Sequence, residues 1–152
     1  MIDDEEQNER IITKYRDTLR DMGLMNLGFG SMFLLMSINK SFYENDECIF
    51  LRQQGLDFGI ALLILSTLQL SFFFVIHRME IKMVQEVFSF LTGLTFLMGL
   101  IFFVLLSYGI YKGEPCGALR ILSIVYIVLV VFSLFCFALI VCCVLILSAN
   151  ER

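Results

Sequence analysis

Cysteine and histidine are the residues in this chain whose types could support redox or metal chemistry. The sequence has five cysteines and a single histidine, His77. Cys136, Cys142 and Cys143 lie in one apolar run with no histidine nearby, and adjacent helical residues point about 100° apart. This spacing does not predict a metal or cofactor site. Small apolar packing is the simpler role for these cysteines, and palmitoylation of Cys142 and Cys143 is the functional alternative.

A catalytic set is not indicated either. His77 stands beside Arg78 at the end of an apolar run, and Glu80 and Glu86 are the nearest following carboxylates. General acid–base catalysis requires a partner held within hydrogen-bond reach, and nothing in this spacing selects one. A lone histidine also cannot supply a two-histidine haem or zinc site. We therefore expect no enzyme, no catalytic residue, no cofactor and no metal, and we place His77 at a membrane interface.

The elements that position these residues are four runs without a charged side chain. They cover residues 22–39, 58–76, 87–111 and 121–150, and all Asp, Glu, Lys and Arg residues lie outside them. A soluble domain mixes charged and apolar residues, because its helices and strands need a wet face. Runs of this length can cross about 30 Å of hydrocarbon as helices. The segregation predicts four membrane spans.

The connections between the runs predict their order. They cover residues 40–57, 77–86 and 112–120, and the third contains Gly113, Gly117 and the only proline, Pro115, which favour a turn. We predict an all-α fold: an integral membrane four-helix bundle in up-down-up-down order, forming one domain over residues 1–152. Residues 1–21 form an acidic tail and a short amphipathic helix, whose expected place is the headgroup layer; docking of a cytoplasmic partner is the alternative.

Two cysteines outside the spans are predicted to form a disulfide. Cys48 lies in the first connection and Cys116 in the third. With four spans these connections share one side of the membrane, so the bond is topologically allowed. If that side is exoplasmic, lumenal or the intermembrane space, disulfides persist there.

Basic residues set the expected orientation. Seven Lys and Arg residues fall on the side of the termini and the second connection, against four on the other side. This bias favours cytoplasmic termini. The first span would serve as the targeting signal, because residues 1–10 resemble neither a signal peptide nor a transit peptide. We expect a secretory-route or plasma membrane, with the mitochondrial inner membrane as the alternative. The acidic net charge of −4 argues against nucleic acid as a partner.

Small residues mark the expected helix contacts, because close backbone approach replaces the hydrophobic effect inside lipid. Ser89, Gly93 and Gly99 fall near one face of the third span, and Gly55 and Gly59 form a GxxxG pattern at the start of the second. We expect these faces to pack within the bundle or against another subunit.

The spans hold few polar residues that could form a transport path. No Asp, Glu, Lys or Arg lies between Asp57 and Arg78 or between Glu86 and Lys112. We therefore expect a non-catalytic accessory or structural subunit, whose partners are membrane lipids and other membrane subunits or itself, with no small-molecule substrate identified. The alternative is a homo-oligomeric pore for small ions or solutes, lined by Ser66 and Gln69.

Overall fold

The chain folds into four long helices. The computed structural model describes residues 2–39, 48–113 and 116–150, with the side chains of 2–5, 137, 138, 140, 141 and 143–150 left aside. The helices are α1 (Ile2–Ile38), α2 (Phe50–Val75), α3 (Ile81–Tyr111) and α4 (Gly117–Asn150), with a short 3-10 helix, η2 (Ile76–Arg78), after α2. These described ranges contain no strand. The fold is therefore all-α as predicted, and all four helices are long and apolar enough to cross a membrane.

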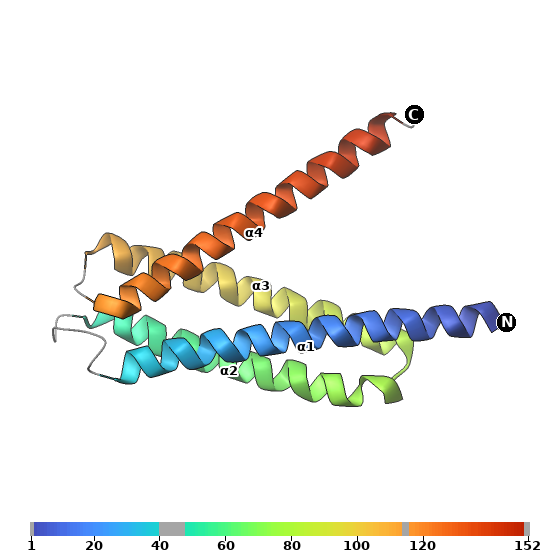
Figure 1. The fold of residues 1–152 in the computed structure, drawn as a ribbon, viewed down its shortest axis with the longest axis horizontal. Helices are drawn as coiled ribbons and strands as arrows, with labels where there is room; N and C mark the ends of the chain where they lie inside the picture. Colours follow the sequence, from blue (N-terminus) through green and yellow to red (C-terminus); the bar gives the residue numbers. More distant parts are fainter. Residues whose placement is uncertain (1, 40–47, 114–115, 151–152) are drawn as a thin grey trace.

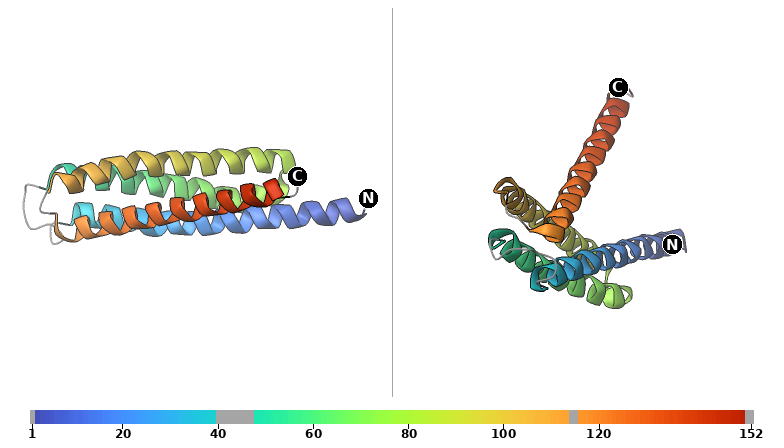
Figure 2. Two further views of the ribbon diagram at one scale, coloured as in Figure 1. Left: turned by 90° about the horizontal axis from the view of Figure 1, so that it is seen from above. Right: turned by 60° about the vertical axis from the view of Figure 1, so that its left-hand side comes forward.

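Three of the helices lie together and the fourth departs from them. Figure 1 shows α1, α2 and α3 side by side, with α4 crossing them near its beginning and then diverging. Figure 2 shows the same divergence from a second direction. The start of α1, the α2–α3 turn and the end of α4 lie toward the right in Figure 1, and the start of α2 and the end of α3 lie toward the left.

The described turns between the helices lie in the connections that the sequence predicts. Met79 and Glu80 are extended and separate η2 from α3. Gly113 (φ 73°) follows α3 and Gly117 (φ 47°) begins α4, both in a conformation that glycine adopts without a Cβ penalty. Pro115, which the sequence also assigns to this turn, lies outside the described residues.

Helix α2 begins earlier than the charge-free run predicts. Residues from Phe50 are helical, although Arg52 and Asp57 are charged. Leu51 is fully buried and would contact a Cβ placed on Gly109 of α3 at 2.8 Å, whereas Arg52, Gln53 and Asp57 are exposed. The start of α2 is therefore amphipathic and is held by packing, so its charged residues mark an outward face and not the end of the helix.

Helix α1 runs through the segment that the sequence separates into an amphipathic helix and a span. It has no break near residue 22. The apolar face of its first half packs on the α2–α3 turn, where Leu19 joins Ile76, Val84 and Leu91 in one buried cluster. Tyr15 packs against Phe88 of α3, with ring centroids 4.6 Å apart and the ring planes tilted by 46°. The first half of α1 thus packs much of its apolar face against the protein itself. Its placement in the headgroup layer stays a prediction.

The main core lies at the opposite end of the bundle, where α4 begins. Phe58 of α2 contacts Phe102 of α3, Tyr126 of α4 and Phe33 of α1, with ring centroids 4.6, 4.8 and 5.0 Å apart. The predicted disulfide is present beside this cluster. Cys48 and Cys116 are buried, their Cα atoms are 5.2 Å apart, and the bond connects the residues that precede α2 and α4. All four helices are thus joined at this end.

Candidate functional site: a lateral groove between α1, α3 and α4

Helices α1 and α2 pack closely at glycines, among them Gly55 and Gly59 of the predicted GxxxG pattern. A Cβ on Gly59 would lie 2.8 Å from the backbone nitrogen of Leu34 and 2.9 Å from the carbonyl oxygen of Gly30. A Cβ on Gly55 would lie 2.6 Å from the hydroxyl of Ser37. These contacts allow close backbone approach between the two helices, as expected for a small-residue interface in lipid.

A chain of polar side chains crosses the interior beside this interface. The amide of Asn26 donates to Oε1 of Gln69 at 2.9 Å, and Nε2 of Gln69 donates to the hydroxyl of Thr95 at 3.0 Å. That hydroxyl in turn donates to the carbonyl of Leu91 at 2.8 Å. Gln69 is fully buried, so these bonds satisfy an amide that would otherwise be costly to bury. The chain connects α1, α2 and α3.

Ser66 belongs to the same buried interface. Its side chain is 1% exposed, and its hydroxyl donates to the carbonyl of Gly23 at 2.8 Å. Ser66 and Gln69, the residues assigned to an alternative pore, therefore lie inside a single chain with their hydrogen bonds made. A pore lined by these two residues would have to break those bonds.

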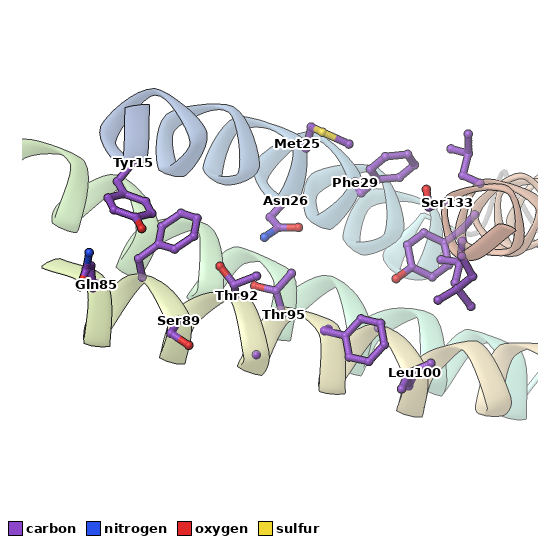
Figure 3. Close-up of a pocket in the computed structure, with 18 residues that line it drawn as sticks. Tyr15, Met25, Asn26, Phe29, Gln85, Ser89, Thr92, Thr95, Leu100 and Ser133 are labelled. Atoms are coloured by element: carbon purple, nitrogen blue, oxygen red, sulfur yellow. The ribbon is translucent and has the colours of Figure 1, made fainter. Parts of the chain in front are cut away.

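The divergence of α4 leaves a cavity of about 1040 Å³ between α1, α3 and α4. We call it the lateral groove. Figure 3 shows that its labelled residues come from α1 and α3 and, at its inner end, from α4. Its walls are mainly apolar, and its polar side chains are all uncharged: Tyr15, Asn26, Gln85, Ser89, Thr92, Thr95, Tyr126 and Ser133.

The floor of the lateral groove is the small-residue face of α3. Ser89, Gly93 and Gly99 all line it. A Cβ on Gly93 would meet no atom within 4 Å, whereas one on Gly99 would lie 3.5 Å from the hydroxyl of Tyr126. The inner part of this face thus packs on α4, and its outer part faces open space. Contact of Ser89 and Gly93 with a helix of another subunit stays a prediction.

The hydroxyl of Thr92 in the groove wall is buried without a hydrogen-bond partner among the described residues. Thr13, Thr18, Thr67 and Thr95 each donate to the carbonyl four residues earlier. The remaining threonine, Thr92, has a buried oxygen with no partner among the described residues. Figure 3 shows its side chain, like that of Asn26, directed into the space between α1 and α3. A buried unpaired hydroxyl is unfavourable, and rotation of the Thr92 side chain would bring this one to the groove, where a ligand could bind it.

The remaining candidate residues lie apart from the groove. Cys142 is an exposed free thiol, and the side chain of Cys143 lies outside the described set. The guanidinium of Arg16 donates to Nε2 of His77 at 2.5 Å, and its Cζ atom lies 5.7 Å from the centroid of the Phe73 ring. This arrangement anchors α1 to the end of α2. Palmitoylation of Cys142 and Cys143 stays a prediction.

Comparison of the chain with protein-family models, with curated proteins and with solved structures found no match. Among the described side chains, no group of three or more His, Cys, Asp or Glu residues is placed to hold a metal ion. Among the described residues, the lateral groove is the candidate binding site.

The sequence predicts the small-residue face of α3 that forms the floor of the groove, but not the cavity above it. Polar residues along α3 indicate this cavity: Gln85, Ser89 and Thr92 recur at spacings of four and three and so share one face. The position of α4 could not be deduced in this way, because its apolar residues surround the whole helix and give no preferred face for packing.

Proposed function

We propose that this chain crosses the membrane in up-down-up-down order with cytoplasmic termini and acts as a non-catalytic accessory subunit of a larger membrane complex. Four apolar helices and large exposed side chains support the membrane setting. Phe74 and Phe90, for example, are 76% and 67% exposed, which suits side chains that face lipid. The alternating helix directions in Figure 1 support the order of the spans.

The observation that carries the subunit proposal is the divergence of α4. Its first turns are held in the bundle, where Leu119, Leu122 and Ser123 are buried. From Ile124 onward one side of α4 borders the lateral groove, beginning at Tyr126, and the other side is exposed. The free side has large apolar residues at helical spacing, each 43–60% exposed: Ile124, Val128, Val131 and Phe135. We call these four residues the outer α4 face.

A partner helix would gain more packing energy from the outer α4 face than from α2. Helix α2 already uses its small residues and buried polar groups within the chain, as Gly59 and Gln69 show. Helix association in lipid rests on side-chain packing, and α4 offers a continuous surface whose packing is not used by the chain itself. The proposed contact is a transmembrane helix of another subunit lying along the outer α4 face.

A photo-crosslinking residue in place of Phe135 tests this proposal in the native membrane. We expect a discrete product between this chain and a different membrane protein. Phe90→photo-crosslinker is the matched control, because Phe90 is a similarly exposed phenylalanine on α3. It should give lipid adducts without that product.

Three results would overturn the subunit proposal: equal products from both positions, no protein product from position 135, or a product with a second copy of this chain alone. The last result would favour the alternative, a homo-oligomeric pore. Conductance in reconstituted bilayers would then test the pore, with Gln69→Leu as the probe of its lining.

A further inference from the structure

The lateral groove is open over a depth that fits one leaflet of a bilayer. It is lined from Gln85 to Leu100 of α3, which at 1.5 Å per residue corresponds to about 22 Å along the helix. One leaflet with its headgroup region is about 20–22 Å deep. At its inner end the groove closes, because Leu122 and Ser123 of α4 are buried in the bundle. A helix that crosses the whole bilayer would not fit such a half-length groove, whereas a lipid of one leaflet would.

The polar groups of the groove are graded along this depth. Gln85 and Ser89 lie near the start of α3, followed by Thr92 with Asn26 of α1 opposite, as Figure 3 shows. Farther along, the walls are mainly apolar, with Phe96, Leu100, Leu129 and Val130, and Tyr126 and Ser133 of α4 are the polar residues there. This gradient matches a molecule with a polar head toward the membrane surface and an apolar tail toward its middle.

The head must be uncharged and must carry more than one hydrogen-bonding group. No Asp, Glu, Lys or Arg among the described side chains lines the groove, so a phosphate would be taken from water without a compensating charge. The hydrogen-bonding side chains from Gln85 to Thr92 extend over about 10 Å of helix, which is more than a single hydroxyl could reach. A diacylglycerol has one hydroxyl and two ester carbonyls, which suits this distribution.

We propose that the lateral groove binds one molecule of diacylglycerol from the leaflet on the side of the chain termini. The glycerol hydroxyl is placed at Gln85 and Ser89, and an ester carbonyl accepts a hydrogen bond from Thr92 after rotation of that side chain toward the groove. An acyl chain lies over Gly93, whose missing side chain leaves the floor open. This proposal does not depend on the partner of the outer α4 face.

Native mass spectrometry of the full chain in mild detergent, with dioleoylglycerol added, tests the proposal. We expect a one-to-one adduct with dioleoylglycerol and little adduct with phosphatidylcholine or cholesterol at the same concentration. Gly93→Leu fills the floor, where a Cβ would meet no atom within 4 Å, and should reduce the adduct at least tenfold. Gly28→Leu is the matched control, because a Cβ on Gly28 also meets no atom within 4 Å and Gly28 does not line the groove.

Thr92→Val keeps the shape of the groove and removes only the hydroxyl. It should weaken the dioleoylglycerol adduct about fivefold, the effect of one hydrogen bond, while Thr67→Val on exposed α2 surface leaves it unchanged. Helix content and elution volume confirm that each variant folds. An adduct that survives Gly93→Leu, or one formed equally by phosphatidylcholine, would overturn the proposal, and a preference for cholesterol would refute the assignment to diacylglycerol.

Discussion

The side-chain amide of Asn26 donates to Oε1 of Gln69 at 2.9 Å, and so joins α1 to α2 within the apolar part of the bundle. Replacing Gln69 by leucine would remove this bond and the bond to Thr95, and would leave the Asn26 amide without its acceptor. We expect the free energy of unfolding to fall by about 1–2 kcal/mol, the range for hydrogen bonds between membrane helices.

Reversible unfolding in mixed micelles measures this loss. Thr67→Val is the control, because Thr67 is exposed and its hydroxyl bonds only within its own helix. It should change stability by much less. If Gln69→Leu and Thr67→Val are equally stable, the chain of polar contacts does not hold the helices together.

The close contact between Gly59 and Leu34 predicts that alanine at position 59 lowers the stability of the chain. Gly59→Ala would place a Cβ 2.8 Å from the Leu34 backbone nitrogen, and backbone atoms cannot move aside as a flexible side chain can. We expect a loss of about 1–3 kcal/mol from overpacking, together with separation of α1 from α2. The measurement is again unfolding in micelles.

Gly93→Ala is the matched control for Gly59→Ala. Its new methyl group would meet no atom within 4 Å. Alanine is the better helix former by up to about 1 kcal/mol, so this variant should be as stable as the original chain or slightly more so. Equal destabilisation by both alanines would contradict the close approach at Gly59.

The disulfide predicts a third result. In protein purified without reductant, alkylation and mass spectrometry should find Cys48 and Cys116 joined and the thiols of Cys136 and Cys142 free. The bond spans 68 residues, and the chain-entropy relation gives about 4 kcal/mol as an upper value, because insertion already confines the reduced chain.

The double replacement Cys48→Ser and Cys116→Ser should therefore lower stability by less than that upper value and loosen α4 from the bundle. Cys136→Ser is the control, since this thiol is free in the structure. Two alkylated thiols at positions 48 and 116 in the original chain would remove the prediction.

The sequence predicts the four helices well because charge and apolar residues are separated along it. It also predicts the disulfide, because an even number of spans brings Cys48 and Cys116 to one side. The start of α2 is less predictable, since burial of Leu51 outweighs the nearby charge of Arg52. The lateral groove depends on where α4 leaves the bundle, and the uniformly apolar surface of that helix carries no periodic signal for this point.

The proposed order and orientation of the spans predict which exposed residues can be labelled from outside a sealed cell. Glu80 lies in the α2–α3 turn, and Gln53 lies in the first turn of α2 near the disulfide. With Cys136, Cys142 and Cys143 replaced by serine, a membrane-impermeant maleimide should label Gln53→Cys in intact cells, and Glu80→Cys only after the membrane is opened. Tags on both termini should behave like position 80. The reverse pattern would contradict cytoplasmic termini alone, whereas labelling of positions 53 and 80 from the same side would contradict the up-down-up-down order itself, because one crossing of α2 must separate them.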